Sequence, residues 1–225
     1  MSKPLRLAVF DCDGTMVDSQ HSIVAAMHAA FAAEGLAPPA AEAVRRVVGL
    51  PLLEAIALLN PTLGPSVHET LREQYRQAYA GSRMRGEIDD PMFPGLTQTL
   101  DDLERDGWLL GIATGKSHVG LVNTLQTHGL LERFLTLQTA DRAAGKPNPD
   151  MLLQAMAETG VDKTQTVMIG DTTFDIEMAR NAGTLAIGVA WGYHEAEELI
   201  SAGAHAVVET YSDVVRTVGG LLETV

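Results

Sequence analysis

In the stretch VFDCDGT, two aspartates, Asp11 and Asp13, stand one residue apart directly after an apolar run. A second acidic pair, Asp171 and Asp175, follows the apolar run TVMIG much later in the chain. Carboxylates that come together repel one another unless positive charge neutralises them. A hard divalent cation with oxygen ligands supplies that charge, and Mg²⁺ fits best because it uses a few carboxylates together with waters and a phosphate. The sequence therefore predicts a Mg²⁺ site built from two distant acidic pairs.

Two further polar residues, Thr114 in WLLGIAT and Lys146 in AAGKPNPD, occupy comparable places along the chain. In an open parallel sheet, ligands bind beyond the carboxyl ends of the strands, where loops converge. If the apolar runs are neighbouring strands, Thr114 and Lys146 share one crevice with the acidic pairs. Gly14 lets the chain turn sharply after the first strand, and Pro147 biases Lys146 toward an extended backbone.

Alternating strand and helix patterns must position these residues. The runs RLAVF, WLLGIA, TVMIG and LAIGVAW are rich in Val, Ile and Leu, which is typical of strands buried on both faces of a parallel sheet. Helical spacing lies between them, as in GLTQTLDDLERDG, SHVGLVNTLQTHG with Ser117 as its cap, and NPDMLLQAMAETG with Asn148 as its cap. This alternation predicts an α/β fold with a doubly wound parallel sheet.

Residues 16–90 break the alternation. They contain no convincing strand and show four helical segments separated by Gly and Pro signals: SQHSIVAAMHAAFAAEG, AAEAVRRVVG, PLLEAIALLN and SVHETLREQYRQAYAG. We expect an all-helical domain over 16–90, inserted into a sheet domain formed by residues 1–15 and 91–225. Residues 16–19 form the first connection between the two domains.

Composition excludes several classes of partner. The 225 residues are 46% hydrophobic and 20% charged, which is typical of a globular protein, and a net charge of -13 argues against binding to nucleic acid or to anionic lipid. No apolar run reaches the roughly 18 residues of a membrane span, and the start of the chain lacks the features of a secretory signal. Cys12 is the single cysteine, which excludes an internal disulfide. We expect a cytoplasmic protein, and its oligomeric state stays open.

The motifs DCDGT, a threonine after an apolar strand, a lysine, and GDTTFD occur here in one order. In this the chain resembles the haloacid dehalogenase-like hydrolase superfamily, in its phosphatase branch, over essentially its whole length. The insertion after the first motif resembles the small helical cap of phosphoglycolate phosphatases and their relatives. The resemblance implies a Rossmann-like core, a helical cap domain, and hydrolysis of a small phosphorylated metabolite.

Transferred to this sequence, the family pattern makes Asp11 the nucleophile that forms an aspartyl-phosphate. It makes Asp13 the general acid for the leaving alcohol and then the base that activates water. Mg²⁺ would bind the Asp11 carboxylate, the main-chain carbonyl of Asp13 and Asp171, with Asp175 nearby, directly or through water. Asp175 could also cap the helix that follows it.

The same resemblance makes Thr114 and Lys146 the groups that hold the phosphoryl oxygens. Backbone N–H groups around Cys12, Asp13 and Gly115 would assist them. The side chain of Cys12 is expected to face away from both aspartates, because alternate side chains at a strand end point apart.

Specificity must come from the cap, and an arginine there matches a substrate carboxylate. Arg45 and Arg46 are the candidates for this contact. The other cap arginines are interpreted as solvated helix charges, and Lys116 as the neighbour of a helix cap.

Within the superfamily, Asp13 favours phosphoryl transfer over dehalogenation, because halide departure needs no proton. A Schiff-base mechanism in the cap is disfavoured, since residues 16–90 contain no lysine. We therefore expect a Mg²⁺-dependent phosphatase, with 2-phosphoglycolate as the best single substrate. A sugar phosphomutase, or a catalytically silent protein that binds a phosphorylated metabolite, remains an alternative.

Overall fold

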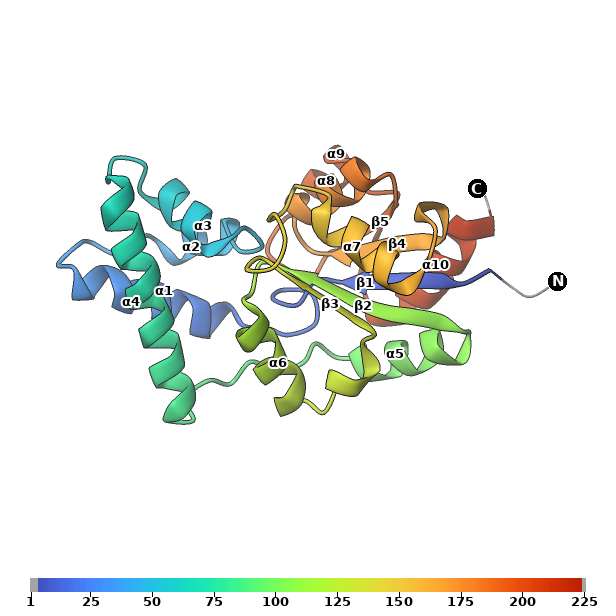
Figure 1. The fold of residues 1–225 in the computed structure, drawn as a ribbon, viewed down its shortest axis with the longest axis horizontal. Coiled ribbons are helices and arrows are strands. Elements are labelled where there is room, and N and C mark those ends of the chain that lie inside the picture. The colour runs from blue at the N-terminus through green and yellow to red at the C-terminus, as the bar shows by residue number, and fades with distance from the viewer. Residues whose placement is uncertain (1–3, 224–225) are drawn as a thin grey trace.

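Strand β1 lies inside a six-stranded sheet in the computed structural model, which describes residues 4–223 (Figure 1). The order is β3-β2-β1-β4-β5-β6, and every neighbouring pair is parallel. The strands are β1 (Arg6–Phe10), β2 (Trp108–Thr114), β3 (Thr136–Thr139), β4 (Thr166–Gly170), β5 (Leu185–Val189) and β6 (Ala206–Val208). The order changes direction beside β1, which is where open α/β sheets form their crevice.

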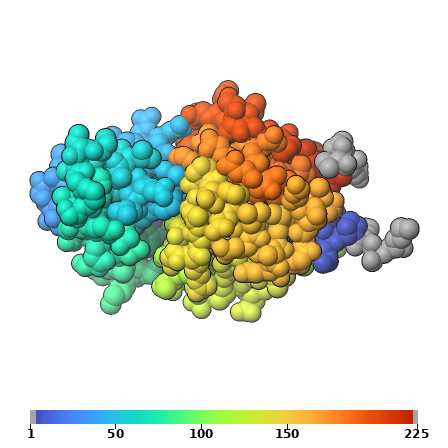
Figure 2. Space-filling view, turned by 45° about the horizontal axis from the view of Figure 1, so that its top comes forward, coloured from blue at the N-terminus to red at the C-terminus, as the bar shows by residue number. Residues whose placement is uncertain are grey.

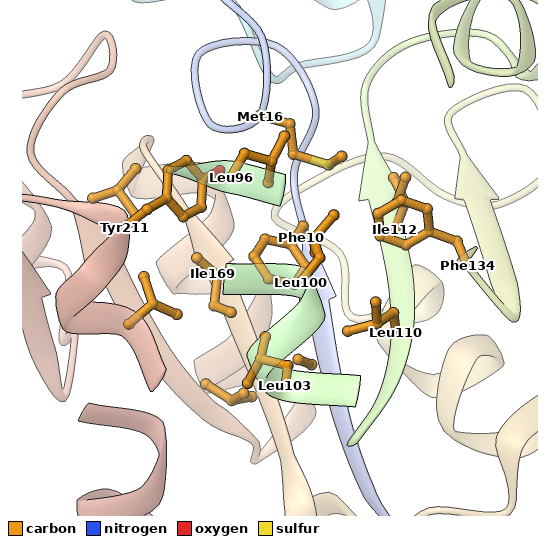
Figure 3. Close-up of a cluster of buried hydrophobic side chains, with 14 of the residues drawn as sticks. Phe10, Met16, Leu96, Leu100, Leu103, Leu110, Ile112, Phe134, Ile169 and Tyr211 are labelled. Carbon is orange, nitrogen blue, oxygen red and sulfur yellow. The ribbon is translucent and has the colours of Figure 1, made fainter. Parts of the chain in front are cut away.

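Helices cover both faces of the sheet, which confirms the predicted doubly wound α/β fold. They are α5 (Leu96–Arg105), α6 (His118–Thr127), α7 (Asp150–Thr159), α8 (Thr173–Ala182), α9 (Ala196–Ser201) and α10 (Tyr211–Glu223), with short 3₁₀ turns at Leu131–Arg133 and Lys163–Gln165. Alternate side chains of each strand point to opposite faces of the sheet. Phe10 packs under α5 and α10 with Leu100 and Tyr211 (Figure 3), whereas Leu7 and Val9 pack toward α7 and α8.

A helical insert follows β1 and consists of α1 (Gln20–Ala33), α2 (Ala41–Arg46), α3 (Leu52–Leu59) and α4 (Pro65–Met84). It has its own apolar cluster, in which Phe31, Ile56 and Leu71 are fully buried. Figure 1 shows the insert at one side of the sheet, and Figure 2 shows it, in blue to teal, in contact with the rest of the chain.

The connections to the insert differ from the predicted boundaries. Met16 and Val17, assigned to the insert from sequence, pack with the sheet, and Val17 forms bridges to Asp13 and to Met92. The two connections therefore run side by side, and Asp18 N–H donates to the Pro91 carbonyl. The parts of the predicted core at 1–3 and 224–225 lie outside the described residues.

Most predicted elements are confirmed, with three corrections. Strands β3 and β6 were not predicted, since three of the four residues of TLQT are polar and AVV is only three residues long. The strand predicted over LAIGVAW is shorter than the apolar run and ends at Val189. Ser117 caps α6 as predicted, but Pro149 is the N-cap of α7, and Asn148 instead accepts the Asp150 N–H with its side chain.

Candidate active site

The predicted site residues meet at the carboxyl ends of three adjacent strands. Asp11 follows β1, Thr114 ends β2, and Asp171 follows β4. The Asp11 N–H donates to the Ile169 carbonyl at 2.9 Å, so the β1–β4 pairing continues into the first acidic residue. The loop before α7 supplies Lys146. The sheet therefore fixes residues that are far apart in sequence next to one another.

Three buried carboxylates form the floor of this site. Ligand atoms of Asp11, Asp171 and Asp175 all lie within 4.8 Å of one another. Lys146 Nζ lies 2.8 Å from Asp11 Oδ1 and 2.6 Å from Asp175 Oδ1. All four side chains are almost completely buried. When the three acids are ionised, the single positive charge of Lys146 does not balance them, and the cluster keeps an excess of negative charge.

Asp11 has one occupied and one free oxygen. Its Oδ1 accepts the Cys12 N–H at 2.6 Å and contacts Lys146, whereas Oδ2 is buried without a hydrogen-bond partner among residues 4–223. Burial raises the pKa of Asp11 to about 7, with a further contribution from Asp175, although Lys146 opposes the shift. A buried carboxylate oxygen with no partner costs free energy unless a ligand or cation completes it.

Asp171 is held rigidly by its neighbours. Its Oδ1 accepts from the Thr15 hydroxyl at 2.7 Å, and its Oδ2 accepts from the Tyr193 N–H at 2.9 Å. A Cβ on Gly14, which has φ +87°, would lie 2.3 Å from Asp171 Oδ2, and one on Gly192 would lie 2.1 Å from Asp171 Cβ. Burial, with repulsion from the other acids, raises the pKa of Asp171 well above its usual value. At positions 14 and 192, only glycine leaves room for the Asp171 carboxylate.

Asp175 has a structural role that the sequence analysis left open. It forms a capping box at the start of α8, where its Oδ2 accepts from the Thr172 N–H at 3.0 Å and from the Thr172 hydroxyl at 2.7 Å. Its other oxygen, Oδ1, contacts Lys146. The residue thus caps its helix and still belongs to the acidic cluster.

The donor set fits a divalent cation. Its atoms are carboxylate oxygens, its charge is negative, and one oxygen of Asp11 lacks a partner. Hard cations such as Mg²⁺ and Ca²⁺ bind such oxygens. The side chain of Asp13 is not part of this cluster, so only its main-chain carbonyl could serve the ligand role implied by the resemblance.

The side chain of Asp13 binds a lysine that sequence reasoning did not select. Lys116 Nζ lies 2.7 Å and 2.9 Å from the two Asp13 oxygens, and the Ser19 hydroxyl donates to Oδ1 at 2.6 Å. Burial lowers the pKa of Lys116, but Asp13 outweighs this and raises it well above its usual value. The spacing TGKS offered only a weak signal, because the contact depends on how β1 and β2 pair.

The remaining sequence-selected residues lie around these groups. Thr114 is buried, and its hydroxyl accepts the Lys116 N–H at 3.3 Å. The Cys12 side chain is fully buried in the apolar cluster beneath α5, as predicted, and burial raises its pKa. Gly115 lies against the insert, since a Cβ there would be 2.6 Å from the Gly49 carbonyl oxygen.

A cavity of about 660 Å³ separates the insert from these groups. Its sheet side includes Asp11, Asp13, Thr114 and Lys116, and its other side is formed by the insert. Asp11 of the acidic cluster therefore faces a partly open cavity of the size that holds a small molecule.

Arg45 and Arg46 do not lie where the sequence analysis expected them. Neither lines the cavity, and Arg46 instead forms a two-pronged ion pair with Glu198 of α9, with N–O distances of 2.7 Å and 2.6 Å. The insert arginines that line the cavity belong to α4: Arg72, Arg76 and Arg83. The packing of α2 turns Arg46 toward α9, and a contact of Arg45 or Arg46 with substrate stays a prediction.

Comparison with known proteins agrees with this geometry. Residues 8–189 match the family model described as haloacid dehalogenase-like hydrolase. The chain belongs to the haloacid dehalogenase-like hydrolases. Among similar members, it is 36% identical over 220 residues to a probable phosphatase, IndB, of Dickeya dadantii, covering 96% of this chain and 95% of the relative.

Other haloacid dehalogenase-like relatives are also phosphatases by name. A phosphoglycolate phosphatase of Agrobacterium fabrum is 34% identical over 198 residues, covering 85% of this chain and 84% of the relative. The crystal structure of a hydrolase from Pseudomonas syringae superposes with a TM-score of 0.84 at 27% identity, over 96% of this chain and 99% of that one. The chain is thus a haloacid dehalogenase-like enzyme of the phosphoric monoester hydrolase type. Among its described helices, none is long and apolar enough to cross a membrane.

Proposed function

We propose that this protein is a Mg²⁺-dependent phosphatase that hydrolyses a small phosphomonoester through an aspartyl-phosphate on Asp11. The observation that carries the proposal is the unpartnered Oδ2 of Asp11, buried at the cavity floor beside Lys146 and two further carboxylates. A positioned nucleophile beside groups that neutralise phosphoryl charge is the minimum machinery for this transfer.

In the first step, Asp11 Oδ2 attacks phosphorus, a P–O bond to the aspartate forms, and the P–O bond to the substrate alcohol breaks. Asp13 donates the proton that the leaving alkoxide needs. In the second step, Asp13 removes a proton from water, which attacks phosphorus and regenerates Asp11 with release of phosphate. Asp13 is separate from the acidic cluster and bound to Lys116, so the two aspartates have different surroundings for different tasks.

Thr114, Lys146 and the N–H groups near Cys12, Asp13 and Gly115 are proposed to hold the phosphoryl oxygens. Lys146 is suited to this because it is buried and already faces Asp11. Asp11, Asp171 and the Asp13 carbonyl would hold Mg²⁺, with Asp175 behind them, and the cation would supply charge neutralisation for the transferred group.

The reference substrate is 2-phosphoglycolate. It is the substrate expected from the family resemblance, and similar proteins are named phosphoglycolate phosphatase. The insert, which closes the cavity from the side opposite the sheet, would exclude water during the first transfer and would also exclude macromolecular substrates.

The test is release of inorganic phosphate from a panel of phosphomonoesters that includes 2-phosphoglycolate, with Mg²⁺ and with EDTA. We expect turnover with Mg²⁺, none with EDTA, and none by Asp11→Asn. Lack of turnover of every ester, or equal turnover by Asp11→Asn, would overturn the proposal.

A further inference from the structure

The cavity is much roomier than phosphate recognition requires, even though the insert already touches the sheet domain. A Cβ on Gly145 would lie 2.0 Å from Pro51 Cγ, and Gly115 lies against the Gly49 and Leu50 carbonyls. Arg46 and Glu198 tie α2 to α9. About 660 Å³ nevertheless stays open, within the roughly 300–1,000 Å³ typical of sites for drug-sized ligands.

The insert side of this cavity is largely apolar. Helices α1 and α3 and the loop between α2 and α3 contribute Ile23, Met27, Val47, Val48, Leu52 and Leu53. Apolar walls gain free energy only when apolar substrate surface covers them. A phosphorylated two-carbon acid has almost no such surface.

One face of α4 adds aromatic rings and positive charge. Tyr75 and Tyr79 line the cavity, with ring centroids 6.0 Å apart and planes inclined by 20°. Arg72, Arg76 and Arg83 recur beside them at helical spacing, so they share that face. Helix α4 therefore presents both aromatic surface and positive charge to the cavity.

Arg72 has a buried donor group without a partner. Its Nη2 lies 2.7 Å from Glu69, but its Nε is buried and has no hydrogen-bond partner within the described part of the chain. A buried guanidinium donor without an acceptor is costly, and a substrate carboxylate would complete it.

We infer that this enzyme prefers phosphomonoesters of a bulky, apolar alcohol, such as a benzylic or alicyclic one, that also carries a carboxylate able to reach Arg72. The inference rests on the proposed function, because it names the substrate class of the same site. The phosphate end lies at Asp11, the body contacts the apolar walls with Tyr75 and Tyr79, and the carboxylate meets α4.

The first test compares esters whose leaving alcohols have similar acidity, so that chemistry does not obscure recognition. They are 2-phosphoglycolate, ethyl phosphate, benzyl phosphate, 4-methylbenzyl phosphate, and 3- and 4-carboxybenzyl phosphate. We expect kcat/KM for benzyl phosphate to exceed that for ethyl phosphate at least about tenfold, because even one methylene in an apolar pocket is worth that much. At least one carboxybenzyl ester should exceed 4-methylbenzyl phosphate.

Two pairs of variants locate the contacts. Arg72→Gln should lower kcat/KM for the preferred carboxybenzyl ester at least about tenfold, the worth of a charge-assisted hydrogen bond, with little change for 4-methylbenzyl phosphate. Arg85→Gln is the control, since Arg85 pairs with Glu87 outside the cavity. Ala80→Trp, which narrows the cavity, should reduce turnover of benzyl esters more than of ethyl phosphate. Ala78→Trp is its control, because Ala78 is on α4 but not in the cavity wall.

Binding of benzylphosphonate and methylphosphonate to Asp11→Asn, measured by calorimetry, reports recognition without turnover. Tighter binding of benzylphosphonate supports the inference. If small esters are hydrolysed but neither benzyl esters nor benzylphosphonate is preferred, the inference is wrong and the proposed function stands. If no ester is hydrolysed by the wild type, the proposed function fails and this inference with it.

Discussion

The metal-free protein should lose stability as pH rises, and Asp11→Asn should abolish much of that loss. Burial and neighbouring acids raise the pKa of Asp11 from 3.8 to about 7 in the folded state. A carboxyl group with a raised pKa stabilises the fold while it is protonated. That contribution is complete below pH 4 and is lost as pH rises through 7.

The expected magnitude follows from the size of the shift. A shift of about three pKa units corresponds to about 4 kcal/mol in total, and roughly 3 kcal/mol of this falls between about pH 5 and pH 8.5. Asparagine has nearly the shape of a protonated aspartic acid, so the two proteins should have similar stability below about pH 4. The variant should be more stable by roughly 1.5 kcal/mol near pH 5, where the unfolded wild type is already ionised at Asp11, and by about 4 kcal/mol near pH 8.5.

The assay is urea unfolding of both proteins in EDTA at the two pH values, followed by tryptophan fluorescence. Saturating Mg²⁺ should restore the unfolding free energy of the wild type near pH 8.5, because the cation binds the ionised cluster and so stabilises the folded state. Parallel loss of unfolding free energy in the wild type and in Asp11→Asn would refute the reasoning. It would mean that the Asp11 charge does not control the stability of the acidic cluster.

Two further substitutions test the surroundings of the aspartates. Gly14→Ala should weaken Mg²⁺ affinity by about 10- to 100-fold in calorimetry, because the added Cβ would collide with Asp171 at a backbone conformation that favours glycine. Gly35→Ala is the control, since its φ is also positive but no atom lies within 4 Å of the added Cβ; equal effects of the two would contradict the claim. Lys116→Met should lower kcat/KM at least about tenfold for a phosphomonoester, because it removes two close contacts to the Asp13 carboxylate in a mostly buried pair. Unchanged kinetics in a correctly folded Lys116→Met, checked by circular dichroism, would show that this lysine does not support Asp13.

The parts of the fold that sequence predicted are those with a strong local pattern. Strands β1, β2, β4 and β5 are continuous apolar runs because helices cover them on both faces. Strand β3 escapes this rule, since its buried Thr136, Gln138 and Thr139 find polar partners. Its pattern therefore does not distinguish it from a loop.

The site was predictable where its residues directly follow strands. Asp11 and Asp171 hold their places through the parallel pairing of β1 and β4, which the sequence pattern indicates. The Lys116 contact and the cavity face of α4 depend on tertiary packing. The helical spacing of Tyr75, Arg76 and Tyr79 was a usable signal for a common face, but it does not say toward what that face turns.

The central claim, a phosphoryl group carried on Asp11, is tested most directly by trapping it. Asp13→Asn lacks the base for the second step, and p-nitrophenyl phosphate has a leaving group that needs no acid, so the intermediate should accumulate with Mg²⁺. Acid quenching followed by mass spectrometry should show the added mass of one phosphoryl group on the peptide that contains Asp11. The double variant Asp11→Asn, Asp13→Asn should show none. An unmodified Asp11 peptide in Asp13→Asn under conditions where the wild type turns over would contradict the account.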